Sequence, residues 1–316
     1  MKAATALVIA AVTFHADAAI GPEVQPLRRV VLALYDSDQY KEVRDTRIHR
    51  LLEMPLNHLG MIVRYQDINA GLPSTEQMAD VRGVVTWFRT DSMRHPVAFL
   101  KWGERAIDSG RRFVVIDYLG ASKDGHGRLT PVPLVNEFFA RLGLRAEDWT
   151  SVTYDQRVVY QNPVMIGFER PLPVRLPAFD RMRIADPAVR SHLTIGRKDA
   201  DRSKDGAIVV TGPHGGWVAT GYTHFASAAQ DRFQWYINPF EFLRLALATD
   251  ELPKPDTTTL SGRRIYYSQI DGDGWRNLTD VAKYRKDGRM SSEVVLREAI
   301  GPFPNLPDRF SENYLR

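Results

Sequence analysis

The chain has 316 residues, of which 44% are hydrophobic and 25% charged, a composition typical of a soluble globular protein. It carries 42 Lys and Arg against 38 Asp and Glu, a formal net charge of +4. Because no basic cluster concentrates this charge, the sequence lacks the electrostatic signature of a nucleic-acid-binding protein. There is no cysteine, which excludes disulfides, zinc–thiolate sites and cysteine nucleophiles. The length predicts about two domains.

The N-terminus predicts a cleavable secretory signal over residues 1–18. Lys2 precedes an uncharged, mostly apolar run at 3–14, and Ala16-Asp17-Ala18-Ala19 supplies the small-x-small pattern that a signal peptidase needs. The apolar run is well short of the roughly 20 residues that cross a bilayer, so we expect no membrane span after cleavage. The expected location is secreted and periplasmic.

The next part of the chain alternates apolar runs with helix-period segments. Nearly continuous apolar runs predict buried strands, and repeats at helical spacing followed by glycine predict helices. The predicted strands cover 29–35, 61–65, 81–88 and 113–118, and the predicted helices cover 45–59, 96–108 and 134–142. Strands alternating with helices predict βαβ units. We therefore expect an α/β fold, a flavodoxin-like doubly wound parallel sheet.

Shorter strands follow, at 152–160, 164–168, 207–211 and 215–225, with a closing helix at 235–247. We interpret them as a β-rich elaboration of the same domain, which would span 24–250. Residues 251–259 contain two prolines and a run of threonines, the composition of a linker. A second domain would then occupy 260–316.

Familiar catalytic and nucleotide motifs fail in the first domain. The segment Gly120–His126 approaches phosphate-loop spacing but has histidine where the lysine is needed, and no dinucleotide or flavin motif follows the first strand. The turn after the fourth strand, 117–120, has no Cys or Ser at the position of a nucleophile elbow. We expect this domain to be non-catalytic. A weaker alternative is an amidotransferase-like hydrolase that uses Asp117 or Ser122.

A predicted hairpin at 215–217 is flanked by His214 and His224, which could face each other and bind a metal, although such pairs are more often structural. Trp217, Tyr222 and Phe225 could form a sugar-stacking face, but aromatic residues in a hairpin more often belong to the core. We expect a structural role for the histidine pair and a core role for the three aromatic residues.

Two carboxylates, Asp271 and Asp273, lie in an Asp-Gly-Asp-Gly turn after a β-prone run that begins at Arg264. The two carboxylates of such a pair can have different roles, since one accepts a proton from a metal-bound water while the other coordinates the metal. An ordinary hairpin turn is the competing interpretation. A calcium loop is excluded because its fifth, sixth and twelfth positions would be Trp275, Arg276 and Ala282.

This stretch carries a resemblance to a known family. The run 262–275 (GRRIYYSQIDGDGW), with the later Ser292-Glu293-Val294-Val295, resembles the start of the deacetylase domain in the periplasmic modification protein of Pel-type exopolysaccharide biosynthesis. The preceding region, including Asn238-Pro239-Phe240, is similar to the flavodoxin-like or amidotransferase-like domain of such proteins. The resemblance implies metal-dependent N-deacetylation of an amino-sugar polymer, with Asp271 as base, Asp273 as metal ligand and a divalent metal such as zinc.

Two histidine ligands that the resemblance implies have no match, because all eight histidines lie at or before His224. The chain ends about 45 residues after Asp271, where a complete domain needs on the order of 100. We therefore expect 260–316 to be an incomplete, truncated polysaccharide-deacetylase (β/α) segment, inactive alone. The expected partners are a polysaccharide and exopolysaccharide synthesis or export proteins. The alternative is a non-catalytic carbohydrate-binding or scaffold module of a polysaccharide synthesis complex.

Overall fold

The computed structural model describes residues 27–150, 156–197, 202–227, 232–254, 259–260, 263–264 and 274–302. The chain forms two compact units, Met1–Pro255 and Asp256–Arg316, and the boundary between them falls inside the segment 251–259. In the ranges just given, no helix is long and apolar enough to cross a membrane.

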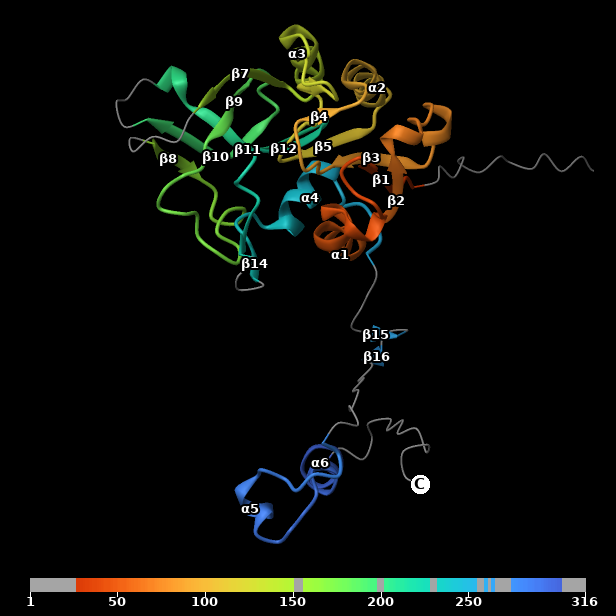
Figure 1. Ribbon diagram of the computed structural model, residues 1–316, viewed down its shortest axis with the longest axis vertical. Helices are drawn as coiled ribbons and strands as arrows, with labels where there is room; N and C mark the ends of the chain where they lie inside the picture. Colours follow the sequence, from red (N-terminus) through yellow and green to blue (C-terminus); the bar gives the residue numbers. More distant parts are fainter. Residues whose placement is uncertain are drawn as a thin grey trace, which may run out of the picture. The chain divides into compact units, whose positions relative to one another are not determined.

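A ten-stranded sheet forms the centre of the first unit, with the order β2-β1-β3-β5-β12-β11-β10-β8 (Figure 1). Two further strands, β7 and β9, pair with each other, and β9 also pairs with β11. The strands are β1 (Val30–Tyr35), β2 (Ile62–Asp67), β3 (Val81–Thr86), β5 (Arg112–Ile116), β7 (Leu144–Thr150), β8 (Gln156–Gln161), β9 (Phe179–Ile184), β10 (Arg190–Arg197), β11 (Gly206–Gly212) and β12 (Gly215–Val218).

The sheet has a parallel half and an antiparallel half. Strand β1 is parallel to β2 and β3, and β5 is parallel to β3 and β12. From β12 onward the pairings β12–β11, β11–β10 and β10–β8 are antiparallel. The predicted α/β class is confirmed. The β-rich elaboration continues this sheet through β11 and β12, so the sheet is mixed.

Helices cover both faces of the parallel half. The longer helices are α1 (Glu53–His58), α2 (Pro96–Asp108), α3 (Val132–Arg141) and α4 (Pro239–Leu247). Helices α2 and α3 pack together on one face, whereas α1 and α4 pack together on the other (Figure 1). Short helical turns are η1 (Val43–Asp45), η2 (Ile48–Leu52), η3 (Ile68–Ala70), η4 (Glu76–Met78) and η5 (Arg202–Lys204).

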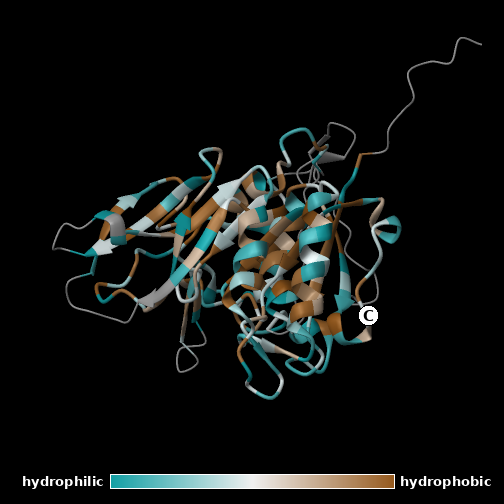
Figure 2. Cartoon of the chain, turned by 90° about the horizontal axis from the view of Figure 1, so that it is seen from above, coloured by the Kyte–Doolittle hydropathy of each residue, from teal (hydrophilic) through white to brown (hydrophobic). Residues whose placement is uncertain are grey.

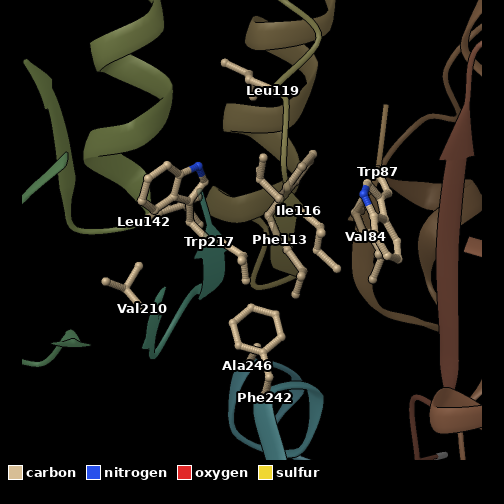
Figure 3. Packing of buried hydrophobic residues seen from close by; sticks show 14 of the residues in the cluster. Val84, Trp87, Phe113, Ile116, Leu119, Leu142, Val210, Trp217, Phe242 and Ala246 are labelled. Carbon is tan, nitrogen blue, oxygen red and sulfur yellow. The ribbon is translucent and has the colours of Figure 1, made fainter. Parts of the chain in front are cut away.

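The core is continuous through both faces of the sheet. Phe113 of β5 and Phe242 of α4 are fully buried, and Trp217 of β12 is nearly so; the three lie close together in Figure 3. The helices turn their apolar residues toward the strands and their polar residues outward (Figure 2). Burial of such side chains contributes about 1.5–3 kcal/mol each relative to exposure, which makes this layer the main source of stability.

The structure corrects three predicted elements. Residues 164–168 form a turn with a single bridge from Ile166 to Ile237, and Val164 and Phe168 are exposed, so their apolar character does not reflect a strand. The predicted strand 215–225 divides into β12 and β13 (His224–Ser227), which pairs with β14 (Arg232–Trp235).

The predicted helix 235–247 begins only at Pro239. The Asn238 side chain accepts hydrogen bonds from the backbone N–H groups of Phe240 and Glu241, at 3.1 and 3.2 Å, and therefore fixes this start. Strands β7, β9 and β10 of the main sheet were not predicted.

The second unit is small. Strands β15 (Thr259–Leu260) and β16 (Arg263–Arg264) form an antiparallel pair, and helices α5 (Ala282–Arg285) and α6 (Ser291–Val295) follow. A π-helical turn, η7 (Leu296–Ile300), continues α6, and the capping hydrogen bond from the Met290 backbone N–H to Glu293 Oε2 is 3.0 Å long. The predicted deacetylase segment is not established by these elements.

Candidate functional site

The carboxyl ends of the parallel strands share one edge of the sheet. Strands β1 and β3 flank the point where the connections reverse direction, and ligands in open α/β sheets bind at such points. The residues that follow β1, β3 and β5 are Asp36, Trp87 and Asp117, all buried. Two short strands, β4 (Ser92–Met93) and β6 (Lys123–Asp124), pair in the loops that follow β3 and β5.

Asp117 has an unusual backbone conformation directly after β5. Its φ is 59°, one of two positive values among the non-glycine residues in the described ranges. Its N–H donates to the Val218 carbonyl at 2.9 Å, so β12 holds this turn in place. A non-glycine residue in the left-handed region is uncommon, although Asp tolerates it better than most. No helix follows this turn directly, since β6 intervenes before α3, so the strand-turn-helix arrangement of a nucleophile elbow does not form here.

Three side-chain donors surround the Asp117 carboxylate. Thr223 Oγ1 donates to Oδ1 at 2.7 Å, and Trp87 Nε1 donates to Oδ2 at 2.6 Å. Arg47 Nη1 also donates to Oδ2, at 3.2 Å. We call the following residues the Arg47 cluster: Tyr40, Arg47, Trp87, Asp117, Thr223 and His224.

Opposing effects act on the ionisation of Asp117. Burial raises the pKa of its carboxyl group, because the charged form loses its hydration. The hydrogen bonds from Thr223 and Trp87 and the charge of Arg47 favour the ionised form and lower the pKa. The net direction is upward. The three donors therefore oppose the effect of burial and favour the charged form of this carboxylate.

His224 follows Thr223 in the chain and lies among aromatic rings. Its ring stacks on Phe233 with centroids 4.4 Å apart and meets Trp87 edge-on at 5.5 Å. Burial and then the charge of Arg47 lower the pKa of His224 to about 4, so the imidazole is neutral at pH 7. Its Nδ1 is buried and has no hydrogen-bond partner in the described ranges.

Tyr40 completes the cluster from the loop after β1. It is 5% exposed, and its hydroxyl is another buried polar atom without a partner in the part of the chain that the structure describes. The Arg89 guanidinium carbon lies 5.6 Å from the centre of the Tyr40 ring. Burial raises the pKa of the Tyr40 phenol, while Arg47 and Arg89 act against this rise, so the hydroxyl keeps its proton.

Arg47 interacts with several members of the cluster. Its guanidinium carbon lies 6.0 Å from the centre of the Trp87 ring, and its charge acts on both Tyr40 and His224. The Arg47 side chain is 34% exposed, whereas Asp117 beneath it is 6% exposed. Arg47 is therefore the group through which the buried cluster reaches solvent.

Asp36 differs from the unpartnered groups nearby, because its hydrogen bonds are complete. Its Oδ1 accepts from Asn69 Nδ2 at 2.7 Å and from the Asp38 N–H at 2.9 Å, and its Oδ2 accepts from Gln39 Nε2 at 3.1 Å. We interpret Asp36 as the residue that shapes the β1 loop and so places Tyr40.

The residues predicted from sequence fare differently. Asp271 and Asp273 lie outside the described residues. Asp117 is central to the site, whereas Ser122 interacts with the buried carboxyl of Asp91. The predicted core role is confirmed for Trp217 and Tyr222, which are buried, whereas Phe225 is only half-buried, with the Arg170 guanidinium carbon 4.2 Å from its ring centre.

The two histidines considered as a pair are separated by strand β12. His214 is exposed in the turn before β12, at the amino end of β5, where its carbonyl accepts from the Phe113 N–H at 2.8 Å. His224 lies beyond the carboxyl end of β12, in the Arg47 cluster. The turn at 219–223 inserts Thr223 beneath Asp117, so the hairpin that would have joined the histidines does not form.

The described ranges contain no group of three or more His, Asp or Glu side chains that could hold a metal ion. Asp271 and Asp273, to which the resemblance assigns the base and the metal ligand, lie outside these ranges.

Four members of the Arg47 cluster were not singled out as site residues from the sequence: Tyr40, Arg47, Trp87 and Thr223. They come from four separate segments that only the strand order brings together. The one sequence signal was Trp87 at the end of a buried strand, since a buried indole N–H needs an acceptor.

No family model matches the sequence, and neither does any curated protein. Solved structures show weak similarity to the fold. The beta-galactosidase from Rahnella sp. R3 aligns with TM-score 0.43 and 13% identity, over 74% of this chain and 32% of that chain. The beta-galactosidase from Bacillus circulans sp. alkalophilus gives 0.42 and 12%, over 71% and 31%.

A putative ThuA-like protein from Bacteroides uniformis gives a TM-score of 0.35 and 14% identity, over 64% of this chain and 85% of that chain. The chain thus spans about a third of the length of either beta-galactosidase. At these scores the similarity assigns neither a family nor an activity to the chain.

Proposed function

We propose that this chain is a secreted protein of exopolysaccharide modification, in which the flavodoxin-like first unit is a non-catalytic carbohydrate-binding module. The assignment to exopolysaccharide modification rests on the resemblance of residues 262–275 to a polysaccharide N-deacetylase. In that proposal Asp271 is the base and Asp273 the metal ligand of a deacetylase segment that is inactive on its own. The binding role of the first unit is supported by the Arg47 cluster.

The observation that carries this proposal is the set of hydrogen bonds to the Asp117 carboxylate. Thr223 donates to Oδ1, and Trp87 and Arg47 both donate to Oδ2, so both oxygens are engaged. A nucleophile or general base needs a lone pair directed at the substrate. Because both oxygens of Asp117 are already bonded within the fold, the arrangement favours a fixed structural anchor over a catalytic carboxylate.

His224 supports the same conclusion. A catalytic imidazole is oriented by a hydrogen bond from one nitrogen so that the other faces the substrate. His224 Nδ1 has no such partner in the described ranges, and its ring is held by Phe233 and Trp87. An unpartnered, neutral imidazole beside aromatic rings suits recognition of hydroxyl or amide groups.

Incubation of the full chain with partly N-acetylated amino-sugar oligosaccharides tests the proposal. We expect binding by calorimetry, with no release of acetate or of shorter oligosaccharides. Asp117→Asn keeps an acceptor at this position and serves as the matched variant. Hydrolysis by the wild type that Asp117→Asn abolishes, with the fold retained by circular dichroism, would contradict a non-catalytic unit.

The deacetylase segment has its own test. Zinc and cobalt are titrated into the wild-type chain and into Asp273→Asn. A single matched carboxylate without histidine ligands should give no tight binding in either protein. Tight binding that the substitution abolishes would show that further metal ligands exist. The expectation that the deacetylase segment is inactive on its own would then be wrong.

A further inference from the structure

We infer that a cavity between η4 and α2 binds a small zwitterion, an α-amino acid with an apolar side chain. The cavity has a volume of about 390 Å³ and is lined by residues 72–78 and by Trp102, Arg105 and Ala106 of α2. We call it the η4 cavity. Its volume is within the range of small-molecule sites, roughly 300–1,000 Å³. The inference does not rest on the proposed carbohydrate-binding function.

The η4 cavity lies toward the amino ends of the parallel strands. The turn η4 leads into the amino end of β3, and α2 leads into the amino end of β5. The Arg47 cluster is built instead on residues that follow the carboxyl ends of these strands. The η4 cavity is therefore a separate site of the first unit.

Two side chains fix the wall that residues 72–78 form. Trp102 Nε1 donates to the Pro73 carbonyl at 2.7 Å, and Arg111 Nη2 donates to the Met78 carbonyl at 2.9 Å. Trp102 and Arg111 are themselves buried. Because the wall is held in place before a ligand arrives, binding does not have to order it.

An arginine without an ion-pair partner lines the cavity. Helix α2 has four charged side chains, and Lys101, Glu104 and Asp108 all form ion pairs. The Arg105 guanidinium forms no ion pair or hydrogen bond within the described ranges. The charge of Arg105 is therefore available to a ligand that enters the cavity.

A carboxylate of opposite charge lines the same cavity. The Ser74 hydroxyl, and then the backbone N–H of Glu76 itself, hold the pKa of the Glu76 carboxyl below its usual value, so this group is ionised at pH 7. In the part of the chain that the structure describes, Glu76 forms no ion pair, with Arg105 or with any other residue. The two charges thus stand apart in one cavity.

A zwitterion matches this arrangement better than a simple ion. Its carboxylate can pair with Arg105 while its ammonium pairs with Glu76. An anion would meet Arg105 but would be repelled by Glu76, and a cation would meet the reverse problem.

Apolar side chains supply much of the remaining lining. Met78, Trp102 and Ala106 are buried, and Leu72 is half-buried. The Trp102 indole N–H already donates to Pro73, so the ring offers an apolar surface to a ligand. An aliphatic side chain placed here would be removed from water together with this surface. The ligand is therefore an amino acid of the leucine type.

NMR titration of the full chain tests this inference with three probes that share one branched aliphatic group. L-Leucine carries both charges, 4-methylpentanoate lacks the ammonium, and 3-methylbutylamine lacks the carboxylate. The Trp102 indole N–H signal reports on the cavity, and the Trp87 signal should not move. We expect leucine to bind about tenfold more tightly than either of the other probes, because each of them loses one charge-assisted contact.

Two variants separate the charged contacts. Arg105→Gln should weaken leucine and 4-methylpentanoate about tenfold and leave 3-methylbutylamine unchanged. Glu76→Gln should weaken leucine and 3-methylbutylamine by a similar factor without weakening 4-methylpentanoate. Arg50→Gln removes an exposed arginine of η2, beside α1 on the other face of the sheet, and should change none of these affinities. All three variants replace exposed side chains, so each should keep the wild-type Tm.

Each outcome decides a different part of the inference. If no probe shifts the Trp102 signal, the η4 cavity is not an amino-acid site and the inference is overturned. If 4-methylpentanoate binds as tightly as leucine and Glu76→Gln changes neither, the site takes carboxylates and the zwitterion assignment is overturned. If leucine is preferred and the two variants lose opposite probes, the inference is supported. The oligosaccharide experiment above decides the carbohydrate-binding function independently.

Discussion

Two partly or fully buried histidines, one in each half of the sheet, differ in how their ring nitrogens are satisfied. His192 lies in β10 of the antiparallel half, where Nε2 is 2.8 Å from Thr211 Oγ1 and Nδ1 is 3.4 Å from Asn162 Nδ2. His224 lies at the carboxyl edge of the parallel half, and its Nδ1 has no partner in the described ranges. Burial lowers the pKa of both.

The comparison shows that burial alone does not identify a functional histidine. A polar side chain whose hydrogen bonds are complete stabilises the sheet, whereas a buried polar side chain that lacks a partner in an otherwise well-bonded region indicates a place where a ligand binds. Variants can remove hydrogen bonds either around His192 or within the Arg47 cluster.

The largest effect is expected at Asp117. Asp117→Ala leaves Arg47, Trp87 and Thr223 without their shared acceptor, and removing one partner of a buried charge pair costs about 3–5 kcal/mol. Urea unfolding measures the loss. Asp117→Asn should lose less, because its amide oxygen still accepts and Asn tolerates a φ of 59°. A loss below about 1 kcal/mol for Asp117→Ala would contradict the anchoring role.

The next effect is the pH dependence due to His224. Its pKa is lowered to about 4 in the folded protein, so the unfolded chain binds this proton first as the pH falls from about 6.5. The contribution of His224 to stability is thus complete above pH 6.5 and is lost as the pH falls toward 4, on the order of 3 kcal/mol in total.

His224→Phe isolates this contribution. The difference in unfolding free energy between the wild type and His224→Phe should be constant above pH 6.5. Below pH 6.5 the wild type should lose stability relative to His224→Phe. Asp117 and His192 titrate in both proteins and cancel in the difference. A difference that does not change between pH 7 and pH 4.5 would show that His224 is not held neutral.

A smaller loss is expected from Thr211→Val in the antiparallel half. The substitution removes the partner of His192 Nε2, and leaving a buried polar atom unpaired costs about 1–3 kcal/mol. Guanidinium unfolding would measure it, with sugar binding expected to remain at the wild-type level. An unchanged stability would mean that His192 is no better satisfied than His224, and the contrast between the two halves would disappear.

The smallest change in stability is expected for Tyr40→Phe, within about 0.5 kcal/mol of the wild type. The deleted hydroxyl is buried without a partner, so its removal costs no hydrogen bond. Differential scanning calorimetry is the measurement, and Tyr65→Phe, which loses its bond to Glu53, is the matched comparison. A clear loss in Tyr40→Phe would show that this hydroxyl is already satisfied.

Much of the parallel half could be predicted from the sequence. The strands near 29–35, 81–88 and 113–118 are buried on both faces, so continuous apolar runs marked them, and α2 begins and ends where its spacing, Pro96 and Gly110 predicted. The antiparallel half could not be predicted as well. The buried residues of β9, Phe179 and Met182, are three apart with charged residues between them, so β9 lacks the period-two alternation that marks a strand. Its place beside β7 and β11 depends on pairings distant in sequence.

The candidate site was predicted only in part. Asp117 was considered only as a residue of a weaker hydrolase alternative, and His224 only as half of a histidine pair for which a structural role was favoured over metal binding. The sequence does not show that Thr223 and Trp87 donate to Asp117 or that β12 separates His224 from His214. Tyr40 lies in the loop after β1, and Arg47 lies at the start of the predicted helix 45–59, so no pattern distinguishes either from a surface residue. Sheet order, which brings these loops together, is the information that was missing.

The indole N–H resonances of the tryptophans offer the most direct test of the central claim, that Asp117 is a fixed anchor bonded within the Arg47 cluster. Trp87 donates its N–H to Asp117 within the cluster, whereas Trp102 donates to the Pro73 carbonyl at 2.7 Å beside α2. In ¹H–¹⁵N spectra of the full chain, Asp117→Asn should shift the Trp87 signal and leave the Trp102 signal unchanged. A Trp87 signal that does not move would show that its N–H is not bonded to Asp117 and would contradict the claim.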